Sequence, residues 1–75
     1  MSISEDSVQR IVIEILRNRP RLSFEELRDI VENVYGIYID GLILRKIISN
    51  LIIDGTICKT PSMERKKLLL ELCSQ

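Results

Sequence analysis

The 75-residue chain contains no histidine, no tryptophan and only two cysteines. Without histidine, a Cys–His nucleophile pair is impossible. Structural zinc sites usually need four cysteine or histidine ligands, and two cysteines in one chain do not supply them. The three glycines do not form a glycine-rich phosphate loop. These absences predict that the protein acts by binding and is not an enzyme, and that it uses no metal and no other cofactor.

An excess of charge is also missing, because 11 basic residues balance 11 acidic ones. Strong non-specific binding to nucleic acid depends on excess positive charge, so any such binding here must depend on where the charges lie. From Gly41 to Gln75 there are six basic residues against three acidic ones, a difference of +3. The six are Arg45, Lys46, Lys59, Arg65, Lys66 and Lys67. The last part of the chain therefore predicts a basic patch on a neutral protein.

Long apolar runs are absent too, since the longest has three residues. Met1–Glu5 lacks the basic start and apolar stretch of a secretion signal, and no segment has the length of a membrane helix. We therefore expect a cytoplasmic protein, or a nuclear one in a eukaryotic cell. Thiols stay reduced there, so the sequence favours two free, partly buried cysteines, Cys58 and Cys73. The alternative is a disulfide between them, which among intracellular proteins is most common in those of hyperthermophiles.

Aliphatic residues are plentiful, and their spacing predicts three helices at about 5–18, 24–35 and 41–53. Each predicted helix follows a residue that can cap its first turn, namely Ser4, Ser23 and Asp40. Ser23 and Glu26 have the spacing of a capping box, in which each side chain bonds the backbone N–H of the other. The three helix starts are therefore the best defined local features of the sequence.

One face of each predicted helix is apolar and is expected to form the core. The predicted buried residues are Val8, Ile11, Val12, Ile15 and Leu16, then Leu27, Ile30, Val31 and Val34, then Leu44, Ile47, Ile48 and Leu51. Gly36 is predicted to end the second helix in a left-handed conformation. Tyr35 and Tyr38 are expected at the edge of the core, not as platforms for stacked bases. Ile13, Ile53 and Leu69 interrupt their patterns, and together they are a candidate dimer patch.

The remainder predicts a β-hairpin over about 56–72, with strands at 56–60 and 66–72 and a turn at 61–65. Leu68, Leu70 and Leu72 alternate onto one face, while Leu69 indicates that part of this strand is covered on both sides. A short helix over 64–73 is the alternative, because Lys, Leu and Glu also favour helices. The predicted fold class is mainly α with a small β-hairpin (α+β), in a single domain spanning 1–75.

The order of three helices and a basic hairpin resembles the winged helix-turn-helix family of DNA-binding domains. Residues 44–57, LRKIISNLIIDGTI, resemble the end of that family's recognition helix, its polar-glycine turn and its first wing strand. Residues 23–27, SFEEL, resemble the start of its second helix. The resemblance covers nearly the whole chain, and it is more specific for fold than for function, because winged helices also serve as protein-interaction modules.

The resemblance implies that helix 41–53 enters the major groove of double-stranded DNA and that the hairpin contacts the backbone. The matching positions are Arg45, Lys46, Ser49 and Asn50 on the helix and Lys59, Arg65, Lys66 and Lys67 on the hairpin. For this function we expect them to form one continuous basic surface. The implied protein is a small transcriptional regulator of an archaeal or archaeal-virus type that acts as a homodimer. The alternative is a protein-interaction module or adaptor, because Leu42 and Ile53 fall on the reading face and the net charge is zero.

Overall fold

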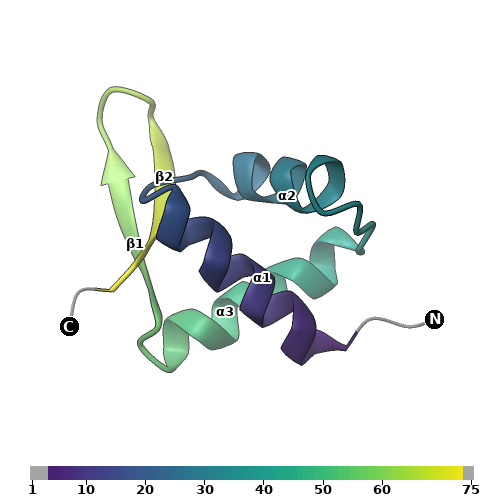
Figure 1. Ribbon diagram of the computed structural model, residues 1–75. Helices are drawn as coiled ribbons and strands as arrows, with labels where there is room; N and C mark the ends of the chain where they lie inside the picture. Colours follow the sequence, from purple (N-terminus) through teal and green to yellow (C-terminus); the bar gives the residue numbers. More distant parts are fainter. Residues whose placement is uncertain (1–3, 74–75) are drawn as a thin grey trace.

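The computed structural model describes residues 4–73, which form three helices and one hairpin (Figure 1). The elements are α1 Glu5–Asn18, α2 Phe24–Asn33, α3 Gly41–Ile53, β1 Ile57–Ser62 and β2 Lys67–Leu72. The hairpin stands at one side of the helices, beside the start of α2 and the end of α3 (Figure 1). The predicted class, mainly α with a small β-hairpin, is confirmed. Within 4–73, no helix combines the length and the apolar character needed to cross a membrane.

All three helices begin at their predicted caps. The Ser4 side chain accepts a hydrogen bond from the Ser7 N–H, and Asp40 Oδ1 accepts one from the Leu42 N–H at 2.7 Å. The capping box is complete, because Ser23 Oγ accepts from the Glu26 N–H at 3.2 Å and Glu26 Oε1 accepts from the Ser23 N–H at 3.1 Å. These bonds satisfy backbone N–H groups that have no partner within a helix, which is why polar residues define the helix starts.

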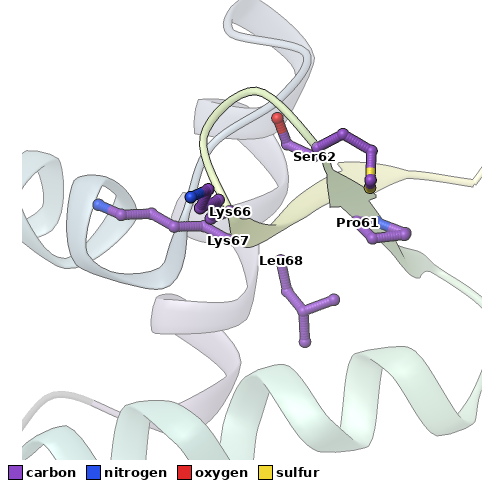
Figure 2. Close-up of a pocket in the computed structure, with 6 residues that line it drawn as sticks. Pro61, Ser62, Lys66, Lys67 and Leu68 are labelled. Carbon is purple, nitrogen blue, oxygen red and sulfur yellow. The ribbon is translucent and has the colours of Figure 1, made fainter.

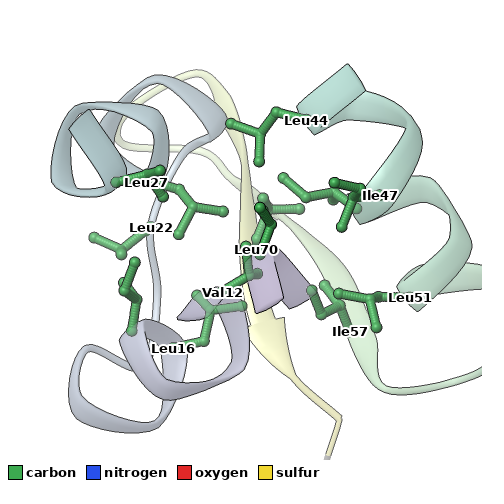
Figure 3. Close-up of a cluster of buried hydrophobic side chains, with 13 residues drawn as sticks. Val12, Leu16, Leu22, Leu27, Leu44, Ile47, Leu51, Ile57 and Leu70 are labelled. Carbon is green, nitrogen blue, oxygen red and sulfur yellow. The ribbon is translucent and has the colours of Figure 1, made fainter. Parts of the chain in front are cut away.

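The core lies where the three helices and the base of the hairpin meet (Figure 3). Most of the predicted faces are buried there, and Ile11 and Ile30 are half-buried against the same cluster. The hairpin contributes Ile57 and Leu70, and the segment between α1 and α2 contributes Leu22. α3 is thus fixed along its inner side by four buried residues, Leu44, Ile47, Ile48 and Leu51.

The predicted end of the second helix is wrong in two details. α2 ends at Asn33, and Val34 is 71% exposed instead of buried. Val34 still has helical backbone geometry, and the chain leaves the helix axis after it: Gly36 has a φ of +69°, as predicted, and the Ile37 N–H donates to the Val31 carbonyl. An extended segment follows, in which Ile37 and Ile39 pack against the core. Because side chains alternate along extended backbone, Tyr38 points outward and is 81% exposed, contrary to the core-edge prediction.

The hairpin pairs β1 with β2 in antiparallel register, with Lys59 opposite Leu70 and Pro61 opposite Leu68. Leu70 also exchanges two backbone hydrogen bonds with Leu22, at 3.1 and 2.6 Å. Hydrogen-bonding directions alternate along a strand, so Lys59 and Pro61 turn their backbone groups away from β2. Pro61 therefore lies in β1, not in the predicted turn, because its missing N–H costs no ladder bond there. A lysine and a proline on this free edge also discourage pairing with another strand.

Leu69 and Leu70 are both buried, at 6% and 5% exposure, although they lie on opposite faces of β2. The strand is therefore covered on both sides at this point, as predicted, and the alternative of a short helix over 64–73 is excluded. The proposed dimer patch is wrong in part, because Leu69 is buried and Ile13 packs against the core. Of its three members, Ile53 alone is exposed.

Cys58 and Cys73 form a disulfide with a Cα–Cα distance of 5.2 Å, so the expectation of two free thiols is wrong. Cys58 lies opposite Glu71, and the Cys73 N–H continues the ladder by donating to the Thr56 carbonyl at 3.0 Å. In this register the two cysteines are diagonal neighbours on one face of the hairpin. A slip of one residue would place them on opposite faces, and the spacing of cysteines in the sequence does not reveal the register.

Candidate nucleic-acid interface

The outer face of α3 is the first part of the candidate interface. Its buried residues fix the rotation of the helix, so the four predicted positions lie together on the exposed side: Arg45, Lys46, Ser49 and Asn50. No side-chain hydrogen bond of Ser49 or Asn50 is found within residues 4–73. Leu42 and Ile53 share this side and are 78% and 82% exposed. The face is therefore a mixed surface with polar groups at its centre and an aliphatic residue at each end.

The two cations of α3 point to opposite borders of this face. The Arg45 guanidinium lies over the Phe24 ring, 4.5 Å from its centroid, and so leans toward the start of α2. Lys46 Nζ is 3.8 Å from Glu5 Oε2 at the start of α1. Both side chains remain exposed, and a cation over an aromatic face keeps its charge and its outward N–H groups. Arg45 and Lys46 thus share the exposed side of α3 with Ser49 and Asn50, and they lean toward different neighbouring helices.

The basic residues of the hairpin form the second part. Lys59, Arg65, Lys66 and Lys67 are all exposed, as predicted. Lys66 lies in the turn with a φ of +53°, the one non-glycine residue with positive φ in 4–73. Arg65 Nη2 is 2.8 Å from Glu26 Oε1, and Lys67 Nζ is 3.5 Å from Glu25 Oε2. Two of the four hairpin cations are therefore directed to the start of α2.

An apolar hollow of about 370 Å³ lies on the distal half of the hairpin, lined by Pro61, Ser62, Met63, Lys66, Lys67 and Leu68. Figure 2 shows Leu68 pointing from β2 toward the helix in the pale green of α3. Leu68 shares a face with Leu70, as the alternation predicted, but it is half-exposed because the hairpin extends beyond the core. Lys66 and Lys67 also line the hollow, while the amino group of Lys67 reaches toward the start of α2.

The expectation of one continuous basic surface is not met. Carboxylates lie beside three of the eight predicted residues, Lys46, Arg65 and Lys67. Sequence reasoning missed these partners, because each pair joins residues that are about 40 positions apart, and it assigned Glu26 to capping alone. Within 4–73, cysteine, aspartate and glutamate side chains do not gather in a group that could hold a metal ion. Three of the six cations of the interface therefore lie next to an acidic partner.

Glu26 has a lowered pKa, mainly because its carboxylate accepts the backbone hydrogen bond from Ser23, with a smaller contribution from Arg65. Burial acts in the opposite direction. A carboxylate whose pKa is lower in the folded state adds stability above its unfolded pKa and loses it as the pH falls through the folded value. The reference value is 4.5, so the loss is confined to acidic conditions below that pH.

We therefore expect Glu26→Gln to be less stable than the parent protein at neutral pH, by less than about 1 kcal/mol because the pair with Arg65 is partly exposed. As the pH falls well below 4.5, this difference should vanish, because the protonated carboxyl then resembles the amide. Urea unfolding of both proteins across this range measures the effect. Glu14→Gln removes a carboxylate on α1 and is the control. An unchanged difference between Glu26→Gln and the parent across the range would contradict the assignment.

No family model matches the chain, and no curated protein matches it. Among solved structures it is similar to the reduced form of MarR from E. coli, with a TM-score of 0.73 over 88% of this chain at 19% identity. The match covers 45% of the MarR chain, so this protein spans less than half of its length. Three helices followed by the antiparallel hairpin are the winged helix arrangement, and the predicted fold is confirmed.

Proposed function

We propose that the protein binds double-stranded DNA as a small transcriptional regulator, with α3 in the major groove and the hairpin on the backbone. The observation that carries this proposal is the outer face of α3, where Arg45, Lys46, Ser49 and Asn50 are all exposed beside a basic hairpin. The winged helix fold supports it, because an exposed third helix flanked by a hairpin has the shape that fits a groove and the adjacent phosphates.

The side chains on α3 have the chemistry to read base edges. Arginine and lysine donate to the O6 and N7 atoms of guanine, and asparagine can form two hydrogen bonds with adenine. The Ser49 hydroxyl can donate or accept a hydrogen bond. Within residues 4–73 the side chains of Ser49 and Asn50 form no hydrogen bond, so both are available to a base edge. Lys59 and Lys66 can neutralise phosphates, which positions a protein without reading sequence. We therefore assign reading to α3 and positioning to the hairpin.

A second copy of the chain is part of the proposal. One domain of this size places one helix in one segment of the major groove. Helix-turn-helix regulators bind two half-sites of an operator as symmetric dimers. Among residues 4–73, five of the eight large exposed apolar residues lie between positions 34 and 43, at the corner joining α2 to α3: Val34, Tyr35, Tyr38, Leu42 and Ile43. Grouped exposed apolar residues are typical of interaction surfaces.

Titration with duplex DNA at two salt concentrations tests the function. With Lys59 and Lys66 of both copies on phosphates, about four cations in all, log Kd should change with log salt with a slope of magnitude about 3 to 4, so affinity falls about 10²-fold between about 50 and 200 mM salt. Fluorescence anisotropy of a labelled duplex measures this effect. Failure to bind at the lower salt concentration, or binding that is insensitive to salt, would refute the proposal.

The second candidate function is a protein-interaction module. Its support is the exposure of Leu42 and Ile53 at the ends of the α3 face together with the apolar hollow on the hairpin. Aliphatic side chains of this kind pack well against a protein partner, whereas DNA offers them little beyond thymine methyl groups. Absence of DNA binding, combined with concentration-dependent association that Leu42→Ser abolishes, would favour this function.

A further inference from the structure

We propose that two carboxylates at the start of α2 control the cations of the hairpin: Glu26 fixes the position of the hairpin turn through Arg65, and Glu25 competes with DNA phosphates for Lys67 and so lowers the DNA affinity. The inference rests on the proposed function. It gives the two carboxylates different parts: Glu26 is a positioning residue, and Glu25 is a competitor that phosphate can displace.

Glu26 is fixed by two bonds to the same oxygen. Its Oε1 accepts the Ser23 N–H at 3.1 Å and lies 2.8 Å from Arg65 Nη2. The carboxylate cannot turn away from the hairpin without breaking the capping box of its own helix. The other end of the contact is also restrained, because the Arg65 N–H donates to Ser62 Oγ at 3.2 Å and closes the turn. Glu26 therefore holds the hairpin turn against α2.

The contact of Glu25 with Lys67 is of a different kind. Its atoms are 3.5 Å apart, and the Glu25 side chain is 77% exposed. Glu25 makes no second contact within residues 4–73 that would restrain it, and exposed pairs of this kind are weak in water. A phosphate that approaches Lys67 can replace Glu25 without disturbing the fold.

Backbone pairing keeps these groups close to each other. The two hydrogen bonds between Leu22 and Leu70 join β2 to the residue that precedes the Ser23 cap. The start of α2 and the base of the hairpin are thus held side by side whether or not the ion pairs form. The backbone segments that carry Glu25 and Lys67 therefore stay close together, so the Glu25 carboxylate remains within reach of Lys67 and can compete with an external anion.

One consequence distinguishes competition from a structural role. In the basic run 65–67, Arg65 and Lys67 each have a carboxylate partner, whereas no carboxylate within residues 4–73 pairs with Lys66. If the carboxylates compete with phosphate, removing the charge of Glu25 must strengthen DNA binding. If they only stabilise the hairpin, the same change must weaken binding or leave it unaltered.

The test compares the full chain with Glu25→Gln on a labelled mixed-sequence duplex of about 30 base pairs. The variant should bind about threefold more tightly, and its salt slope should steepen by about 0.9 for each bound copy, because one more lysine of that copy contacts phosphate. Glu14→Gln is the matched control, because it makes the same charge change in an exposed pair on α1. Lys67→Ala combined with Glu25→Gln should lose the gain.

The outcomes separate the inference from the proposed function. If the parent protein does not bind the duplex at all, the proposed function fails and the inference falls with it. If the parent binds but Glu25→Gln and Glu14→Gln behave alike, the inference alone is overturned, because net charge then explains the result. The part assigned to Glu26 has its own readout: amide hydrogen exchange at Arg65–Lys67 should quicken in Glu26→Gln and not in Glu25→Gln. Equal exchange in the two variants would overturn that part.

Discussion

Replacing both cysteines by serine is expected to lower the free energy of unfolding by about 3 kcal/mol, because the disulfide closes a loop of about 15 residues in the unfolded chain. The bond between Cys58 and Cys73 joins the two ends of the hairpin, so the loop contains β1 from Cys58 onward, the turn and the whole of β2. A small domain has a total stability of roughly 5–15 kcal/mol, so this loss is a large part of what holds the fold.

Urea unfolding of the oxidised protein, with and without dithiothreitol, measures the effect. The control is the variant that combines Cys58→Ser with Cys73→Ser, whose unfolding midpoint should not respond to dithiothreitol. We expect the hairpin to lose hydrogen-exchange protection first, since its distal half has no contact with the core. Two titratable thiols per oxidised chain, or a parent midpoint that does not respond to reduction, would contradict the bond.

The helices could be predicted closely because their determinants are local. A cap side chain acts within three residues of the helix start, and the buried face follows from the helical period. The predicted burial of Val34 was wrong, because Val34 lies at the end of the apolar pattern and the chain changes direction at Gly36. The prediction for Tyr38 failed for a related reason: the segment after Gly36 is extended and turns Ile37 and Ile39 toward the core, and no local signal sets which side chains point inward there.

The candidate site was predictable to the extent that it depends on one helix. The exposed positions of α3 follow from its buried ones, and all four predicted residues lie where expected. The surroundings of the hairpin were not predictable, because they depend on the register of the strands. The register of β1 against β2 decides that Cys58 meets Cys73, and the pairing of Leu70 with Leu22 brings Lys67 close to Glu25. No local pattern encodes these contacts, which come from packing between distant segments.

The second large effect is expected on DNA binding when Lys46→Ala and Asn50→Ala are combined. Each base contact is worth about 1–3 kcal/mol of discrimination, so the double variant should bind a preferred duplex about 10²-fold more weakly. Both side chains are exposed and outside the core, so stability should change by no more than about 0.5 kcal/mol per substitution. The preferred duplex is one that the parent protein selects from a random pool, and anisotropy titrations compare it with a mixed-sequence duplex.

Lys59→Ala combined with Lys66→Ala is the matched control, because it also removes two exposed side chains but from the hairpin. If α3 reads bases and the hairpin binds phosphate, the α3 variant must lose preference between the two duplexes, while the hairpin variant must weaken both alike and flatten the salt slope by about 0.9 per lysine. Equal weakening of both duplexes by the α3 variant would make α3 a second phosphate contact. The protein would then bind DNA by charge and shape alone, a weak mode of binding for a chain whose net charge is zero.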